Sequence, residues 1–154
     1  MNATLSRPSA VGLADISQQE VMLLLVGAVE DNDSKSASFF SHSTWQARRV
    51  PGCREALPLI RLGLHGVIVV ERDLPDGNWK DVLEFASFRN KPPLVIVTSR
   101  LADDYLWAEV LNLGGYDVLA KPFIRDEVNR TINLAWQRWK NQGEAVSNAR
   151  KAGK

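Results

Sequence analysis

The stretch over residues 66–77 constrains the fold of this chain strongly. It holds four consecutive β-branched apolar residues at positions 67–70, preceded by Gly66 and followed by the charged Glu71. A short, wholly apolar run of this kind predicts a strand that is buried on both faces, as in the middle of a parallel sheet. In open α/β sheets, ligands and reacting groups lie outside the carboxyl ends of the strands. We therefore expect a functional group of this chain at Glu71.

Alternating apolar runs and helical patterns predict the rest of the fold. Further strands are expected over residues 21–26, 45–50, 94–97 and 116–120. Helices are expected over residues 35–42, 54–62, 79–88, 102–113 and 126–140. Arg48 and Arg49 dilute the second strand and place it at or near a sheet edge. Because strands and helices alternate with short connections, we expect an α/β fold, a doubly wound parallel sheet of five strands with five helices on its two faces.

Length and composition bound the class of protein. The 154 residues fit one domain over residues 21–140, with a flexible N-terminal arm over residues 1–20 and a polar C-terminal tail over residues 141–154. A formal net charge of +1 and a hydrophobic fraction of 45% predict neither a nucleic-acid nor a membrane surface. No apolar run approaches the ~20 residues of a membrane span. The single cysteine, Cys53, has no partner for an intramolecular disulfide, so we expect a cytoplasmic protein.

Polar side chains follow three of the predicted strands. Glu71 ends the third strand, Thr98 and Ser99 end the fourth, and Lys121 follows the fifth. The carboxyl ends of parallel strands meet at one edge of a sheet. We therefore expect a carboxylate, a hydroxyl and an ammonium group to share one shallow site.

Four segments of the chain form an ordered set of motifs. They are E-A-L-P-L-I at 55–60, E-R-D-L-P-D-G at 71–77, V-I-V-T-S at 95–99 and G-G-Y-D-V-L-A-K-P-F at 114–123. In these motifs and their order, over roughly residues 21–139, the chain resembles the receiver domain of two-component response regulators. The resemblance implies a flavodoxin-like (CheY-like) fold and a place in a bacterial phosphorelay.

The resemblance also implies roles for single residues, and this chain departs from several of them. In the family, a histidine kinase phosphorylates a strand-end aspartate beside Mg²⁺, which an acidic pair after the first strand holds. Here the phosphoacceptor position is Glu71, and the acidic pair is replaced by Gly27 and Ala28. Val118 stands where the family has its switch aromatic residue. Because Mg²⁺ demands oxygen ligands in octahedral geometry, we expect no metal or other cofactor and no metal-dependent phosphorylation. The chain is therefore interpreted as an atypical or pseudo-receiver.

We expect Glu71 to form a permanent ion pair with Lys121, together with a hydrogen bond from Thr98. Glutamate extends the carboxylate by about 1.5 Å relative to aspartate, towards the place of a phosphoryl oxygen. It brings one negative charge against the ~1.5 to 2 of a phosphoryl group, so the mimicry is partial. Such a contact would hold the domain in one conformation without any phosphoryl group.

Two other interpretations stay open. In the first, the chain is a conventional Mg²⁺-dependent phosphoacceptor, which uses Asp73, or uses Glu71 with Glu30 or Asp31 as metal ligands. Residues 30–34 are more typical of a helix N-terminus with acidic and capping residues than of a metal site. In the second, the chain is a flavodoxin-like enzyme or nucleotide binder. It carries no G-x-G-x-x-G, no P-loop motif and no catalytic triad pattern, so we expect no enzymatic activity.

The expected partner is a protein: a histidine kinase, a phosphotransfer protein or an output protein. The resemblance implies docking through the fourth helix, fifth strand and fifth helix, and a homodimer is possible in this scheme. Direct binding of nucleic acid or membrane is not expected. Trp136 and Trp139 are either a partner-binding patch or one core and one half-exposed residue. Fifteen residues follow Trp139, so we expect any effect to be exerted in trans, unless the chain is a piece of a longer protein.

Overall fold

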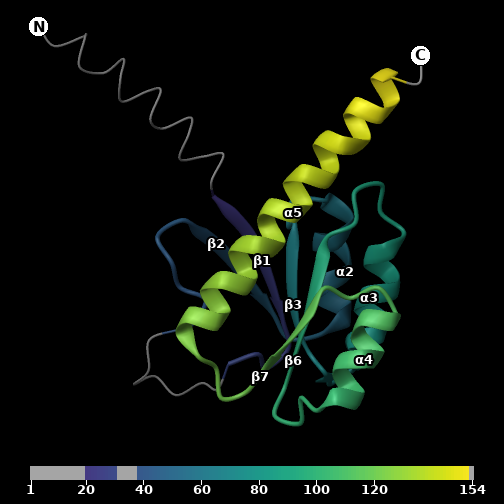
Figure 1. Ribbon diagram of the computed structural model, residues 1–154. Helices are drawn as coiled ribbons and strands as arrows, with labels where there is room; N and C mark the ends of the chain where they lie inside the picture. The colour runs from purple at the N-terminus through teal and green to yellow at the C-terminus, as the bar shows by residue number, and fades with distance from the viewer. Residues whose placement is uncertain (1–19, 31–37, 153–154) are drawn as a thin grey trace, which may run out of the picture.

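A five-stranded parallel sheet forms the centre of the molecule (Figure 1). The computed structural model describes residues 20–30 and 38–152. The strands of the sheet are β1 (Val21–Val26), β2 (Trp45–Val50), β3 (Val67–Glu71), β6 (Leu94–Ser99) and β7 (Asp117–Ala120). Their order is β2-β1-β3-β6-β7 with parallel pairing throughout. The five predicted strands are therefore confirmed, and β2 lies at an edge as its arginines indicated.

Four helices occur in the described part of the chain. They are α2 (Cys53–Leu62), α3 (Trp79–Ser87), α4 (Asp104–Asn112) and α5 (Arg125–Ala152). The Asn78 side chain accepts a hydrogen bond from the backbone of Lys80 at the start of α3, and Asp103 caps α4 in a similar way. None of these helices combines the length and the apolar character that a bilayer span requires.

The helix predicted over residues 35–42 is wrong in the part that can be checked. Residues 38–42 contain a turn at positions 39–40 and no helix, and residues 35–37 lie outside the described residues. The Glu30 carboxylate accepts hydrogen bonds from Ser38 Oγ at 2.6 Å and from the backbone N–H of Phe39 at 2.9 Å. Ser38 Oγ also accepts from the N–H of Phe40, and side-chain bonds of this kind compete with helix formation. Phe40 is buried, and its ring contacts Phe123 edge-on. The described fold therefore has four helices rather than the expected five.

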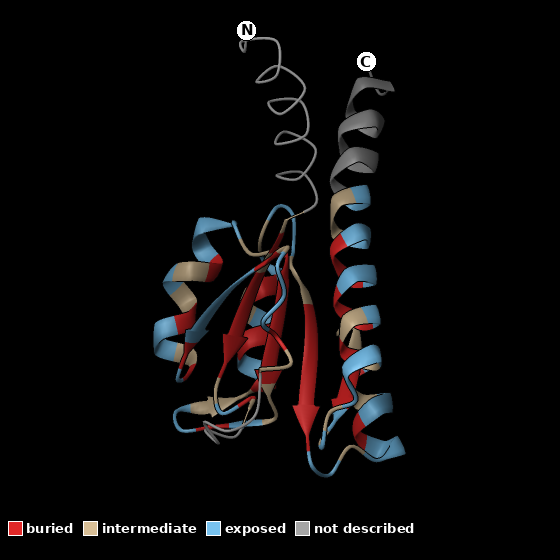
Figure 2. Ribbon diagram, turned by 90° about the vertical axis from the view of Figure 1, so that its left-hand side faces the viewer, coloured by how far each residue is buried: buried red, intermediate tan, exposed pale blue. Residues whose placement is uncertain are grey.

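Two apolar layers enclose the sheet, one on each face (Figure 2). Side chains from α2, α3 and α4 pack on one face, with Ile60, Val82 and Val110 among them. Side chains from α5 pack on the other face, with Val128 and Ile132 fully buried. All four apolar residues of β3 have zero exposure, so this strand is the buried central element that its sequence predicted.

A short hairpin follows β3, within the segment that carries the Pro-Asp-Gly turn residues at 75–77. It consists of β4 (Asp73–Leu74) and β5 (Gly77–Asn78), paired antiparallel. The backbone N–H of Arg72 bonds to the carbonyl of Thr98 at 2.9 Å, which ties the start of the hairpin to β6. The hairpin therefore begins at the carboxyl edge of the sheet, next to Glu71.

The last helix, α5, continues beyond its predicted end near residue 140 and reaches Ala152, past the end of the sheet (Figure 1). The segment over residues 141–152 contains Gln, Glu, Ala, Arg and Lys, which all favour helix. Gly143 costs only about 1 kcal/mol relative to alanine. The predicted polar tail is therefore helical through Ala152, while residues 153–154 lie outside the described residues.

At the amino end of β3, α5 is held by two tryptophans. Trp136 is 8% exposed, Trp139 is half-buried, and their ring centroids lie 4.9 Å apart. Lys91 Nζ lies 3.6 Å from the centre of the Trp139 ring. The two residues are therefore one core and one half-exposed side chain, as one of the two sequence interpretations held.

The free energy of unfolding is expected to fall as the pH is lowered through about 6.5, the ordinary pKa of histidine. Burial lowers the pKa of His65, and the positive charge of Arg48 adds to this effect. The unfolded chain then binds a proton at His65 more readily than the folded protein, so acidification favours unfolding. Urea unfolding between pH 8 and pH 5.5 measures this slope.

The variant His65→Gln is expected to flatten the slope in that pH range, and the exposed His42→Gln serves as the matched control. Glu30 does not interfere, because its pKa lies below 4.5 and its contribution is lost only at lower pH. An unchanged slope in His65→Gln would contradict the assignment.

Candidate functional site

The carboxyl ends of β3, β6 and β7 bring the predicted polar residues together. Glu71 pairs in register with Thr98 across the β3 and β6 strands. The backbone N–H of Lys121 bonds to the carbonyl of Ser99 at 3.0 Å, so the segment after β7 stays beside β6. Parallel register thus places a carboxylate, a hydroxyl and an ammonium group at one edge of the sheet.

One oxygen atom of Glu71 is the centre of this site. Lys121 Nζ lies 2.7 Å from Glu71 Oε2, and Thr98 Oγ1 donates a hydrogen bond of 2.7 Å to the same oxygen. The two charged side chains are largely shielded, with exposed fractions of 9% for Lys121 and 18% for Glu71. The contacts that the sequence predicted are therefore present, and their role in function stays a prediction.

The ammonium of Lys121 has a second partner that the sequence did not indicate. Its Nζ donates a hydrogen bond of 2.8 Å to the backbone carbonyl oxygen of Ala28. Ala28 follows β1, at one of the two positions where the resemblance places an acidic metal ligand. The ammonium thus bridges the end of β3 and the segment after β1.

Gly27, the other of these two positions, has no space for a side chain. Its φ angle is +87°, a conformation that residues other than glycine rarely adopt. A Cβ atom there would lie 2.5 Å from Leu74 Cδ2 and 3.2 Å from Glu71 Cβ. Leu74 comes from the β4 strand of the hairpin and is itself buried. A side chain at position 27 would therefore be strained by the positive φ and would require Leu74 to move.

These residues do not fit a magnesium ion. Mg²⁺ prefers several oxygen ligands at octahedral positions, usually with at least one or two carboxylates. The described residues contain no group of three or more His, Cys, Asp or Glu side chains that could hold a metal ion. The Ala28 carbonyl and Glu71 Oε2 already bind the Lys121 ammonium.

Two other predicted positions do not contact the Glu71 carboxylate. Ser99 Oγ accepts a hydrogen bond of 3.0 Å from the backbone N–H of Leu101 and so shapes the turn after β6. Val118 is 9% exposed and belongs to the core on the α2, α3 and α4 side. An aliphatic side chain fixed in the core cannot supply the aromatic rearrangement of the family.

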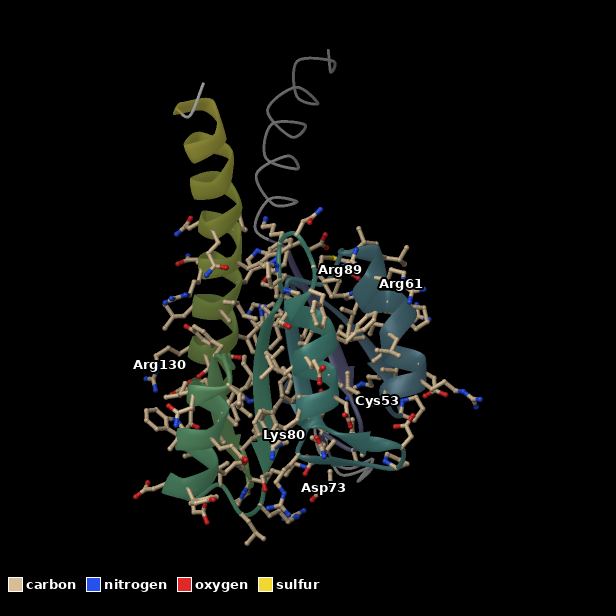
Figure 3. All side chains as sticks on the ribbon, turned by 90° about the vertical axis from the view of Figure 1, so that its right-hand side faces the viewer. Cys53, Arg61, Asp73, Lys80, Arg89 and Arg130 are labelled. Carbon is tan, nitrogen blue, oxygen red and sulfur yellow. The ribbon has the colours of Figure 1, made fainter. Side chains whose placement is uncertain are left out.

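The alternative acids are engaged elsewhere. Asp73 is 74% exposed and accepts two hydrogen bonds from Arg72, at 3.0 and 2.9 Å (Figure 3). Glu30 forms an ion pair of 2.8 Å with Arg49. Burial opposes ionisation of Glu30, but hydrogen bonds from Ser38, Arg49 and the Phe39 N–H outweigh it and lower its pKa. Asp31, the other proposed metal ligand, lies outside the described residues.

Asp76 is a site-supporting residue that sequence reasoning missed. Its carboxylate accepts hydrogen bonds from the backbone N–H groups of Cys53 at 2.8 Å and Arg54 at 2.9 Å. These bonds lower the pKa of Asp76 and satisfy the N-terminus of α2, for which Gly52 offers no side chain. The hairpin that carries Leu74 is thus attached to α2. The Pro-Asp-Gly turn signalled the loop but not this distant contact.

Comparison with known proteins agrees with this architecture. No protein-family model and no curated protein sequence matches the chain. Among solved structures, the Francisella response regulator 1452 receiver domain is 28% identical, with a TM-score of 0.64 over 77% of this chain and 98% of that chain. The signal receiver domain of an HD domain-containing protein from Pseudomonas fluorescens is 19% identical, with a TM-score of 0.70 over 82% of this chain and 93% of that chain.

A CheY-like response regulator receiver domain protein from Methanospirillum hungatei is 16% identical, with a TM-score of 0.65 over 80% of this chain and 98% of that chain. The chain has the receiver-domain fold. Within that fold, Glu71 ends the central strand and Lys121 follows the last one, as in the family pattern that the sequence resembles. The site departs from that pattern at Gly27 and Ala28, which stand where the family has its acidic pair, and the Lys121 ammonium contacts the Ala28 carbonyl there.

Proposed function

We propose that the chain is a receiver-like signalling module of a two-component phosphorelay that binds a protein partner and accepts no phosphoryl group. The observation that carries the proposal is the 2.7 Å contact between Lys121 Nζ and Glu71 Oε2, supplemented by the hydroxyl of Thr98. In this contact the negative charge of Glu71 is balanced by the positive charge of Lys121, so the pair needs no further ion for neutrality. In this proposal the module has no catalytic activity of its own.

The chemistry of phosphoryl transfer supports the proposal. A carboxylate that attacks a phosphoryl group brings negative charge towards negative charge, and bound metal ions normally neutralise it. Here Glu71 Oε2 is already bound by Lys121 and Thr98. Gly27 and Ala28 supply no side-chain ligand for a metal. One oxygen of Glu71 is thus bound by two donors, and the residues at positions 27 and 28 would not help to hold a metal beside it.

The proposed docking surface is the face formed by α4, β7 and α5. Large apolar side chains on α4 and α5 are exposed: Tyr105 is 82% exposed, Trp107 is 50% exposed and Leu134 is 51% exposed. Trp107 Nε1 donates a hydrogen bond of 3.3 Å to Asp117 of β7, which holds the indole over this face. Exposed apolar groups of this size often mark protein interaction sites. One solved neighbour, at 23% identity, is a beryllofluoride-activated NtrC4 receiver domain dimer, so a second copy of this chain is one candidate partner.

Incubation with acetyl phosphate and MgCl₂, followed by intact-mass measurement, tests the proposal. We expect no added phosphoryl mass, because Gly27 and Ala28 offer no carboxylate to hold a metal and Glu71 Oε2 is bound by Lys121 and Thr98. The matched control is the Francisella receiver domain, treated under the same conditions. An added phosphoryl mass on this chain would overturn the proposal, and peptide mapping would then show whether Asp73 or Glu71 carries the group.

A further inference from the structure

We infer that the ammonium group of Lys121 is the resident cation of this site, in the place that the receiver fold implies for a divalent metal ion. The inference rests on the proposed function and deepens it, because it states what keeps the site in one state without metal or phosphate. It starts from the disagreement between the expected Mg²⁺ and the residues that are present. Three observations carry it: the contacts of Lys121, the shielding of these contacts and the packing at Gly27.

The contacts of Lys121 are those of a small cation between two strand ends. Its Nζ lies 2.7 Å from Glu71 Oε2 and 2.8 Å from the Ala28 carbonyl oxygen. A lysine ammonium has three N–H donors, and two of them are used in this way. The charge of the ammonium equals that of the single carboxylate. One internal group therefore neutralises Glu71 and joins the end of β3 to the segment after β1.

The shielding of Lys121 keeps this cation in place. Its side chain is 9% exposed, and a shielded ion pair is weakened much less by salt than an exposed one. A metal ion at the same point would have to displace the ammonium. The displaced Lys121 ammonium would lose both of its oxygen partners, and an unpaired charge in a shielded position raises the free energy of the folded protein.

The packing at Gly27 disfavours a metal ligand at this position. A side chain at position 27 requires the unfavourable φ of +87° and would lie 2.5 Å from Leu74 Cδ2 unless Leu74 moves. Leu74 is buried and belongs to the hairpin that Asp76 attaches to α2. The hairpin therefore opposes an acidic side chain at one of the two positions where the family holds its metal.

Removal of the ammonium should leave an opening that a small external cation can fill. In Lys121→Ala, Glu71 Oε2 and the Ala28 carbonyl oxygen lose their shared donor. The probe is methylammonium chloride, and tetramethylammonium chloride at the same concentration is the control because it is too bulky and has no N–H donor. We expect methylammonium to raise the melting temperature of Lys121→Ala by about 2 to 4 °C more than tetramethylammonium does. For the wild-type protein we expect no difference between the two salts.

Magnesium titration of the wild-type protein is a second measurement that needs no variant. With amide resonances followed by NMR, we expect no saturable shift at Ala28, Glu71 or Leu74 on addition of MgCl₂. The inference is overturned by a saturable shift at these amides, or by equal effects of the two ammonium salts on a folded Lys121→Ala. Its failure is distinguishable from failure of the proposed function. Saturable Mg²⁺ binding without added phosphoryl mass overturns only the inference that Lys121 is the resident cation. Added phosphoryl mass overturns the proposed function.

Discussion

Replacement of Lys121 by methionine is expected to lower the free energy of unfolding by about 3 kcal/mol. Methionine keeps most of the length and apolar character of the lysine stem but removes the charge. Glu71, whose side chain is 18% exposed, would then keep only the hydroxyl of Thr98 as a partner. Loss of one partner from a buried pair typically costs 3 to 5 kcal/mol, and the partial exposure of Glu71 places this pair near the lower end. Urea unfolding at pH 7, followed by circular dichroism, measures the change.

A double-mutant cycle with Glu71→Gln shows whether the cost comes from the pair itself. If the charges interact, the double variant should lose less stability than the sum of the two single variants, with a coupling energy of about 1 kcal/mol or more. The exposed pair between Lys80 and Glu109 is a matched control. Lys80→Met should cost less than about 1 kcal/mol, as surface pairs do. Strictly additive effects at positions 71 and 121 would show that the site is not held by this contact.

Strands and their order on the chain could be read from the sequence because burial leaves a clear pattern. The runs that became β1, β3 and β6 are rich in Val, Ile and Leu and have Gly or Pro next to one end. A parallel sheet covered on both faces requires such runs. Helix boundaries were less well defined, since α5 continues through a polar segment whose residues include several that favour helix.

The segment between β1 and β2 could not be predicted in this way. Residues 35–42 contain Ser, Ala and two phenylalanines, a composition compatible with a helix. In the structure, Phe40 is buried and Glu30 holds the N–H of Phe39. Tertiary packing and a hydrogen bond to a residue nine positions away determine this conformation, and neither leaves a local pattern.

In the candidate site, too, some features follow from the sequence pattern and others depend on tertiary contacts. The sequence was enough to predict that three side chains lie close together, those of Glu71, Thr98 and Lys121, because parallel strands place their carboxyl ends at one edge of the sheet. The contact of Lys121 with the Ala28 carbonyl oxygen could not be predicted, since a backbone oxygen carries no signature in the sequence. The burial of Leu74 beside Gly27 depends in turn on the hairpin. Sequence reasoning identified Gly27 and Ala28 as departures from the family's acidic pair, and the structure adds the contact between Lys121 and the backbone of Ala28.

Replacement of Gly66 by alanine is expected to lower the free energy of unfolding by about 2 to 3 kcal/mol. A Cβ atom at this position would lie 2.4 Å from Cδ2 and Cε3 of Trp139 and 2.8 Å from Cζ3 of Trp136. Gly66 is buried at the start of β3, and its carbonyl accepts the N–H of Leu94, so the backbone has little freedom to withdraw. The indole rings must move instead, and α5 moves with them. Urea unfolding followed by tryptophan fluorescence measures both the stability and the environment of the rings.

A smaller side chain at position 139 tests whether the rings cause this cost. Trp139→Leu alone loses apolar burial and the contact with Lys91, but it frees space beside Gly66. In the Trp139→Leu background, Gly66→Ala should therefore cost less than in the wild-type protein, by at least about 1 kcal/mol, because contacting residues couple. Gly63→Ala is an unsuitable control despite its open surroundings, since φ is +73° there and alanine would be strained. An equal cost of Gly66→Ala in both backgrounds would show that the strain lies in the β3 backbone and that the two tryptophans can adjust without moving α5.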